Sequence, residues 1–222
     1  MKSIFPAKLL PGDTVAVIAP SRSLSIISDE NKKVADKRFA DLQFQLVLGE
    51  HCLECDEFKS SSIASRVTDI HAAFTNPDIK AILMVIGGFN VNQLLRYLDW
   101  DKVRANPKIL CGYSDITALS NAIYAKTGLV GYSGPHYSSF GQKLHFDYTL
   151  DYFKRCLMSD EPFVIKPSTK WSDDKWYENQ DHRELVPNEG WLVINPGEAS
   201  GTIIGGNLCT LNLLQGTRPV PI

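Results

Sequence analysis

The chain has 222 residues, of which 44% are hydrophobic and 22% are charged, and its formal net charge is −2 at pH 7. This balance is typical of an ordinary globular protein, and the small net charge gives no electrostatic attraction to nucleic acid or to anionic membranes. The length favours one large α/β domain followed by part of a second.

The N-terminal segment contains a short apolar run that Pro6, Pro11 and Gly12 interrupt before a signal-peptide core is formed. No uninterrupted apolar stretch of the sequence is long enough to span a bilayer. We therefore expect a cytoplasmic protein without a membrane partner and without a nucleic-acid partner.

Apolar runs alternate with helical patterns along the first 160 residues, which predicts βαβ units and a mainly parallel sheet. Strands are predicted at 14–21, 45–51, 80–88, 108–114 and 129–134. Helices are predicted from the first loop to about 43 and at 62–76, 90–100, 115–128 and 148–160. The strand at 80–88 is apolar throughout, as expected where both faces of a sheet are covered.

The composition changes after residue 160. Residues 161–190 are rich in Pro, Asp, Trp, Lys and Glu, which indicates a linker or a surface excursion, and residues 191–216 resume β character with one short helix. We divide the chain into an N-terminal domain (1–165), a linker or loop (166–188) and the start of a C-terminal domain (189–222).

The five cysteines are an odd number spread over a chain too large to need disulfide bonds, so we expect reduced thiols. Cys52 and Cys55 form a CxxC motif, but no second pair completes a zinc site, and a structural role is favoured. We expect no metal and no cofactor. A flavin or nucleotide carrier is a weaker alternative, because the first loop, APSRSLS, lacks the glycine spacing of a phosphate-binding loop.

Ser114 lies in ILCGYSDITAL, at the corner where the predicted strand 108–114 meets the helix after it. In open parallel sheets ligands bind beyond the carboxyl ends of the strands, and a serine at such a corner is a candidate nucleophile for acyl transfer. The alternative is that Ser114 only caps the helix. The glycine that would complete G-x-S-x-G is absent, since Ile116 stands there.

Two backbone N–H groups are candidates for binding the oxyanion of a tetrahedral intermediate. One belongs to Asp115, in the first turn of the predicted helix, and the other to Gly88 or Gly87, at the end of the strand 80–88. The alternative is that the glycine pair only makes a turn and that Asn90 caps the helix it opens.

Four segments resemble the LD-carboxypeptidase family of serine peptidases, in its branch of microcin C immunity proteins. They are GGFNVNQLLRYLDW, NPKILCGYSDITALSNAIYAKTGLVGYSGPHYSSFG, WSDDKWY and GTIIGGNLCTLNLLQG. The resemblance implies a flavodoxin-like, mainly parallel sheet flanked by helices, followed by a β-rich C-terminal domain. It also implies a Ser-His-Glu triad that cleaves an amide bond beside a free carboxylate, in a murein peptide or in a microcin-like aminoacyl nucleotide.

Position by position, the resemblance places the nucleophile on Ser114 and the oxyanion donors on the backbone amides of Gly88 and Asp115. It places Trp171 and Trp176 in a loop that stacks on a nucleobase, and we include Asn90 with them as substrate-binding residues. The alternative for the tryptophans is that they cover the edge of the core, because Trp is commonly half buried.

In the family the histidine and the glutamate of the triad come from the C-terminal domain, after the segment that GGNLCTLNLLQG matches, whereas this sequence stops at Ile222. His136 is the only histidine expected at the carboxyl side of the sheet, but position alone does not establish a base. We therefore expect a truncated chain that is weakly active or inactive. The alternative function is a non-catalytic remnant that binds a peptide or a nucleotide-like ligand.

An incomplete β domain would leave apolar side chains without partners, which favours association between chains. The side chains in question are Leu208, Leu211, Leu213 and Leu214. We therefore expect a homodimer.

Overall fold

A four-stranded parallel sheet forms the centre of the protein in the computed structural model, which describes residues 2–217. The strands are β1 (Thr14–Ile18), β2 (Gln45–Leu48), β3 (Ile79–Met84) and β4 (Ile109–Cys111), in the spatial order β2-β1-β3-β4. This is the strand order of doubly wound flavodoxin-like sheets, so the predicted fold class is confirmed.

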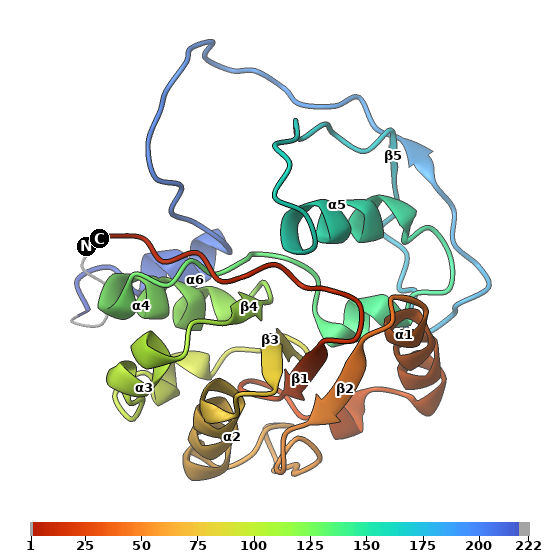
Figure 1. The fold of residues 1–222 in the computed structure, drawn as a ribbon. Helices are drawn as coiled ribbons and strands as arrows, with labels where there is room; N and C mark the ends of the chain where they lie inside the picture. Colours follow the sequence, from red (N-terminus) through yellow and green to blue (C-terminus); the bar gives the residue numbers. More distant parts are fainter. Residues whose placement is uncertain (1, 218–222) are drawn as a thin grey trace.

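Helices cover both faces of the sheet. Figure 1 shows α1 (Asp29–Asp41) on one side of the strands and α2 (Ile63–Thr75) and α3 (Trp100–Ala105) on the other. The further helices are α4 (Ile116–Thr127), α5 (Asp147–Leu157), α6 (Leu208–Leu213) and the short 3-10 turns η1 (Leu24–Ile26), η2 (Val91–Leu94) and η3 (Tyr137–Gly141). Residues 81–85 of the third strand and its extension are all buried, as the apolar run predicts.

Side-chain caps set the helix starts. The hydroxyl of Ser28 accepts a hydrogen bond from the N–H of Asn31 at the start of α1, and the hydroxyl of Ser62 accepts one from the N–H of Ser65 at the start of α2. Gly128 ends α4 in the left-handed conformation with φ +80°, which a residue with a side chain adopts only at a cost.

Two predicted β segments differ from the structure. Residues 129–134 make only two isolated parallel bridges, between Ile4 and Leu129 and between Cys111 and Tyr132, so no continuous fifth strand forms there. Residues 191–206 contain no strand; the short antiparallel pair β5 (Lys170–Trp171) and β6 (Val186–Pro187) lies earlier. No residue of 191–206 pairs with a strand within residues 2–217, and a strand needs a partner for its backbone groups.

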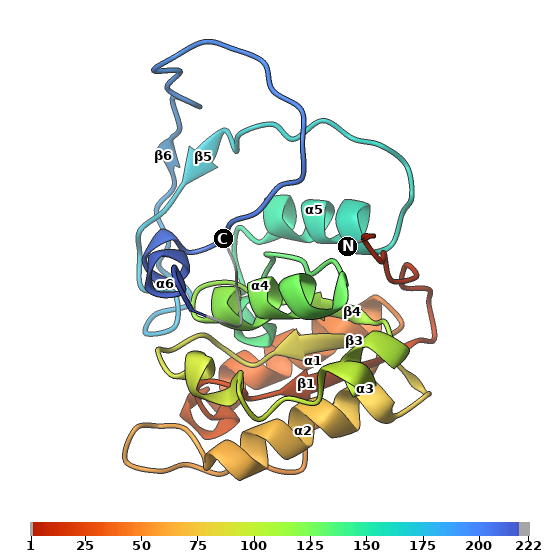
Figure 2. The same cartoon turned by 90° about the vertical axis from the view of Figure 1, so that its left-hand side faces the viewer.

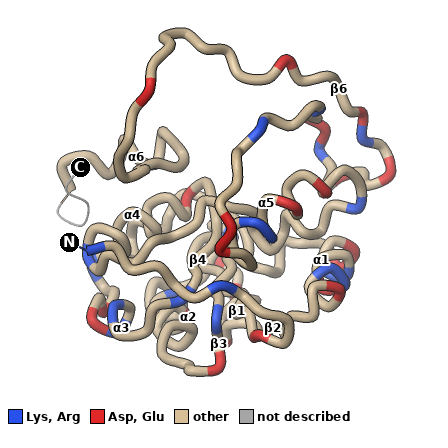
Figure 3. The backbone as a smooth tube through the Cα atoms, turned by 45° about the horizontal axis from the view of Figure 1, so that its top comes forward, with Lys and Arg blue, Asp and Glu red and all other residues tan. Residues whose placement is uncertain are grey.

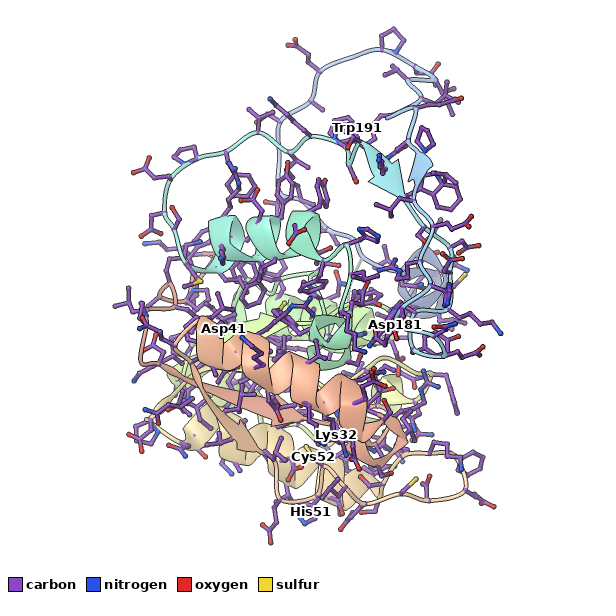
Figure 4. All side chains as sticks on the ribbon, turned by 90° about the vertical axis from the view of Figure 1, so that its right-hand side faces the viewer. Lys32, Asp41, His51, Cys52, Asp181 and Trp191 are labelled. Atoms are coloured by element: carbon purple, nitrogen blue, oxygen red, sulfur yellow. The ribbon has the colours of Figure 1, made fainter. Side chains whose placement is uncertain are left out.

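The chain between residues 161 and 206 makes an excursion that lies in large part away from the body of the protein (Figures 1 and 2). It contacts the body at Gln180, whose buried side-chain amide donates to the Asn31 side chain and to the Gly141 carbonyl. Trp191 lies in this excursion beside β5 and is 65% exposed (Figure 4). The chain returns at Gly205–Asn207, where the Asn121 amide donates to the Gly205 carbonyl at 3.0 Å and the Asn207 N–H donates to the Thr117 hydroxyl at 2.9 Å. These bonds hold the start of α6 against α4.

The four leucines of the α6 region do not share one environment. Leu208 and Leu213 are 78% and 76% exposed, as the prediction of unpartnered apolar side chains requires, and Leu211 is partly buried. Leu214 is only 3% exposed because it packs into the main core, so the prediction was wrong for this residue.

The charged residues form a mixed surface, in keeping with the small net charge. Figure 3 shows acidic and basic residues interspersed along α1 and α3. Within residues 2–217, no helix combines the length and the apolar character that crossing a bilayer requires.

All five cysteines are free thiols. In the CxxC motif Cys55 is exposed, whereas Cys52 is buried and its Sγ donates to the Val17 carbonyl at 3.1 Å. Burial raises the pKa of the Cys52 thiol to about 12, so this thiol is not a nucleophile at neutral pH. The structural interpretation of the motif agrees with this arrangement.

His51 lies after the carboxyl end of β2, next to Cys52 (Figure 4). Its ring forms an ion pair with Asp69 when it is protonated. The His51 Nδ1 lies 2.7 Å from Oδ1 of the buried Asp69, and this hydrogen bond raises the pKa of His51 above its usual 6.5. The carboxylate also accepts from the His51 backbone N–H. The pair therefore holds the loop after β2 to α2.

The His51–Asp69 pair predicts a pH-dependent contribution to stability. Because the pKa of His51 is higher in the folded protein, the contribution is fully present below about pH 6.5 and is lost as the pH rises through the folded value. We expect His51→Gln to lower the free energy of unfolding more at about pH 5.5 than at about pH 8.5. Urea unfolding of both proteins at the two pH values measures this; an equal difference at both would contradict the prediction.

Candidate active site

Ser114 occupies a strained corner between β4 and α4. Its φ is +61°, in the left-handed region that residues other than glycine rarely adopt and that costs about 1–2 kcal/mol. The helix α4 begins at Ile116 with Asp115 as the N-cap residue, and the Ser114 hydroxyl accepts no hydrogen bond from the described residues. The alternative that Ser114 serves only as a helix cap is therefore wrong.

Two glycines make room for this corner. A Cβ on Gly87 would lie 2.9 Å from Cβ and 3.0 Å from Oγ of Ser114. A Cβ on Gly112 would lie 2.8 Å from the Met84 side chain and 3.1 Å from Ile116. The tight strand-to-helix turn is thus built by close packing of glycine backbone, although the sequence lacks the second glycine of G-x-S-x-G.

The predicted oxyanion donors are available. Among residues 2–217 the backbone N–H groups of Gly88 and Asp115 have no hydrogen-bond partner. Gly88, Asp115 and Ser114 line one cavity together, so the residues that carry the two amides lie at the same cavity as Ser114. Unpaired N–H groups beside a serine hydroxyl are the arrangement that a tetrahedral oxyanion needs.

The Asp115 side chain holds the loop that carries one of these donors. Its Oδ2 accepts three hydrogen bonds: from the Ser21 hydroxyl at 2.7 Å, from the Asn90 N–H at 2.9 Å and from the Val91 N–H at 3.0 Å. Asp115 is only 5% exposed, so these bonds are shielded from water. Sequence reasoning used the backbone amide of Asp115 and missed its carboxylate and Ser21.

Arg66 supports the same loop from α2. Its guanidinium donates to the carbonyls of Pro20 and Asn90 at 3.2 and 3.3 Å and to the Gln93 side chain at 3.0 Å. The Asn90 side chain is buried and donates to the Ser60 hydroxyl at 3.1 Å. Asn90, predicted to bind substrate, thus lies within the loop's own hydrogen-bond network and lines neither cavity at Ser114. No periodicity in the sequence marks Arg66, because its partners are distant loops.

Ser114 opens into two cavities. The larger, of about 430 Å³, is lined by Arg22, Ile86, Gly87, Gly88, Phe89, Tyr113, Ser114, His136, Ser138, Ser139, Trp176 and Tyr177. The smaller, of about 250 Å³, lies under α6 and is lined by Gly88, Phe89, Asn92, Ser114, Asp115, Ala118, Asn207, Cys209, Thr210, Leu213 and Leu214. The hydroxyl is therefore accessible to a small molecule.

The two predicted tryptophans are separated by the structure. Trp176 lines the larger cavity together with the neighbouring Tyr177. Trp171 pairs with Val186 in the β5–β6 ladder, is 51% exposed and lines neither cavity at Ser114. Phe89, Tyr113 and Tyr177 are aromatic residues at this cavity that sequence reasoning did not single out.

His136 is a neighbour of Ser114 without being bonded to its hydroxyl. Its Nε2 lies 2.9 Å from the Tyr113 carbonyl oxygen and its ring stacks on Tyr113, with 4.1 Å between ring centroids. Burial lowers the pKa of His136 to about 4, so the ring is neutral at pH 7. Among the described residues, no histidine or carboxylate is hydrogen-bonded to the Ser114 hydroxyl.

No group of three or more His, Cys, Asp or Glu side chains in the described part of the chain is arranged to hold a metal ion.

The chain is similar to known proteins in sequence and in fold. The profile of the LD-carboxypeptidase N-terminal domain matches residues 15–134, a range that includes Gly88, Ser114 and Asp115. A putative carboxypeptidase of Bacillus subtilis, YocD, is 56% identical over 98% of this chain and 67% of its own length. The crystal structure of an MccF-like protein from Bacillus anthracis is 56% identical and superposes with a TM-score of 0.98 over 99% of this chain and 67% of that one.

The microcin C7 self-immunity protein MccF of Escherichia coli is 34% identical over 98% of this chain and 65% of its own length. A structure of MccF in complex with aspartyl sulfamoyl adenosine superposes with a TM-score of 0.90 over 99% of this chain and 68% of that one. The chain thus spans about two thirds of the length of the relatives that it matches.

Proposed function

The chain belongs to the LD-carboxypeptidase family, and we propose that Ser114 is the nucleophile of a serine peptidase that hydrolyses an amide bond beside an anionic group. The observation that carries the proposal is the Ser114 corner itself. The Ser114 backbone has a φ of +61°, and Ser114 lines two cavities. The N–H groups of Gly88 and Asp115, which line one of these cavities with it, have no hydrogen-bond partner among the described residues.

In the proposed reaction the Ser114 Oγ attacks the amide carbonyl carbon while its proton passes to a general base. The Gly88 and Asp115 amides donate to the oxyanion of the tetrahedral intermediate. The C–N bond then breaks, the amine leaves with the proton from the base, and water hydrolyses the acyl-serine ester. Neither donor has to move or give up another partner within the described residues, so the hole is ready before the substrate enters.

We assign the general base and its orienting carboxylate to residues that correspond to the remaining third of the relatives, outside the part that this chain matches. His136 does not fill this role in our proposal, because its Nε2 faces the Tyr113 backbone and its pKa is lowered. Serine hydrolases that lack a triad member retain about 10³–10⁴-fold acceleration over water through the oxyanion hole and substrate binding. The chain alone is therefore proposed to turn over slowly.

The substrate is proposed to be a murein peptide or a microcin-like aminoacyl nucleotide. MccF has been solved with aspartyl sulfamoyl adenosine, and the larger cavity here presents Trp176 and Tyr177. Aromatic side chains of this kind stack on nucleobases. For Trp171 we propose only a structural role, in the β5–β6 ladder from which the Trp176 loop extends.

A fluorophosphonate probe tests the assignment of the nucleophile. We expect the Ser114 Oγ to displace fluoride from the probe, as identified by peptide mass spectrometry, and Ser114→Ala to remain unlabelled, because the two N–H donors beside Ser114 stabilise the phosphonyl oxygen of the adduct. Ser133→Ala, which changes an exposed serine on a neighbouring loop, is the matched control and should label like the unchanged protein. Labelling that persists in Ser114→Ala, or absence of labelling, would refute the assignment.

One observation favours a second candidate, a non-catalytic binding protein. The Ser114 hydroxyl has no base among the described residues, while the cavity beside it is open. Calorimetry with an aminoacyl sulfamoyl adenylate, followed by analysis of the ligand, separates the two functions. Binding with the ligand recovered intact supports the binding protein, and release of the amino acid supports the peptidase.

A further inference from the structure

Arg22 is a cationic residue at the larger cavity that has no role in the proposed reaction. It lies in the loop after β1 and its Nε donates to the Gly87 carbonyl at 3.0 Å. Its two terminal nitrogens, Nη1 and Nη2, have no hydrogen-bond or ion-pair partner among residues 2–217. The guanidinium is thus anchored at one edge, and the other edge remains available.

The hydrogen bond from Arg22 to the Gly87 carbonyl fixes the peptide group whose N–H is the proposed Gly88 oxyanion donor. In a trans peptide the C=O and the next N–H point in opposite directions, so holding the Gly87 carbonyl also sets the direction of the Gly88 N–H. The Arg22 stem lies close to the same peptide, since a Cβ on Gly88 would be 3.1 Å from the Arg22 Cγ. Arg22 is therefore positioned relative to the oxyanion hole by direct contact.

The cavity is electrostatically suited to an anion. Arg22 is the only residue with a formal charge at pH 7 in its lining, because His136 is neutral there and no Asp or Glu contributes. Burial lowers the pKa of His136, and the nearby charge of Arg22 lowers it further. An anion that enters meets one cation and no carboxylate, and a guanidinium binds carboxylate or phosphate oxygens through two parallel N–H groups.

We propose that Arg22 binds the anionic oxygen group that lies beside the scissile amide of the substrate, while its Nε holds the Gly87–Gly88 peptide in place. The inference rests on the proposed function and names the residue that selects the substrate. The shared chemistry is a planar or tetrahedral oxyanion, which is the terminal carboxylate in a peptide and the phosphate in an aminoacyl nucleotide. In both, the group belongs to the leaving half of the molecule.

Calorimetric titration of the Ser114→Ala protein tests the proposal without turnover. One pair of ligands is a tetrapeptide ending in D-alanine and the same peptide with a C-terminal amide; the other pair is adenosine monophosphate and adenosine. In at least one pair we expect the anionic ligand to bind about 10–100-fold more tightly than the neutral one, the range for a charge-assisted hydrogen-bonded pair. The pair that shows the preference identifies the source of the anion.

Adding Arg22→Gln to the Ser114→Ala protein should reduce that preference to within about twofold, because the anionic ligand loses its charged partner. Arg22→Lys keeps the positive charge but lacks the two parallel N–H donors of the guanidinium, and it should retain an intermediate preference for the anionic ligand. Arg104→Gln, which changes an arginine on α3 that pairs with Asp101, is the control and should leave the preference intact. Thermal melts confirm that each variant is folded.

A preference that survives Arg22→Gln, or the absence of any preference in both pairs, would overturn the proposal. Failure of the peptidase assignment gives a different pattern. In that case the Arg22-dependent preference remains, while Ser114 is not labelled by the fluorophosphonate and the ligands are not hydrolysed.

Discussion

Replacing Asp115 with alanine is expected to lower the free energy of unfolding by about 3 kcal/mol or more, which lowers the melting temperature of a chain of this size by about 6–12 °C. The buried carboxylate accepts hydrogen bonds from the Ser21 hydroxyl and from the N–H groups of Asn90 and Val91. Alanine leaves the N–H groups of Asn90 and Val91 buried without an acceptor and leaves the Ser21 hydroxyl only its 3.4 Å hydrogen bond to the Asn90 Oδ1. Each buried donor without an acceptor costs about 1–3 kcal/mol. Thermal denaturation followed by circular dichroism measures the effect.

Asp115→Asn is the informative partner variant. Asparagine retains one acceptor oxygen at nearly the same volume, so we expect roughly half the loss of stability. Asp101→Ala, which removes an exposed carboxylate paired with Arg104 on α3, is the surface control and should change the free energy of unfolding by less than about 1 kcal/mol. Equal melting temperatures for Asp115→Ala and the unchanged protein would show that the network does not hold the loop.

Gly87→Ala is expected to lower the rate at which a fluorophosphonate labels Ser114 by about 10²–10³-fold, while the protein remains folded. The added Cβ would lie 2.9 Å from Cβ and 3.0 Å from Oγ of Ser114, closer than such atoms approach. Either the Ser114 corner or the strand-end loop has to shift, and both displace the hydroxyl from the Gly88 and Asp115 amides. Second-order rate constants of labelling measure the loss.

Gly201→Ala is the matched control for this substitution. Gly201 lies in the exposed excursion, and nothing lies within 4 Å of a Cβ added there. It should label at the rate of the unchanged protein. If Gly87→Ala labels at that rate as well, the close approach of Gly87 to Ser114 is not required for the reactivity of the hydroxyl.

The local patterns of the sequence determined the central architecture. The apolar runs ending at Ile18, Met84 and Cys111 predicted buried parallel strands because each run is continuous and followed by turn residues. They also placed Ser114 and the glycine pair at the carboxyl edge of the sheet, since adjacent parallel strands end at the same side. These conclusions need only the order of residues along short segments.

The same patterns overestimated the regular structure at the margins. The segments 129–134 and 191–206 have the composition of strands. Among the described residues only the first pairs with a strand of the sheet, through a single bridge to β4. A strand depends on backbone partners that a one-dimensional pattern does not contain.

Only the tertiary structure decided the conformation of Ser114 and the contacts of the residues around it. The choice between cap and candidate nucleophile depends on a φ of +61°, which close packing against Gly87, 27 positions earlier in the sequence, accommodates. Ser21 reaches Asp115 across 94 positions, and Arg22 reaches Gly87 across 65. Such contacts follow from how the loops at the sheet edge pack together, and local sequence carries no periodic signal for them. For the same reason the sequence treated Trp171 and Trp176 alike, while the fold brings only Trp176 to the cavity.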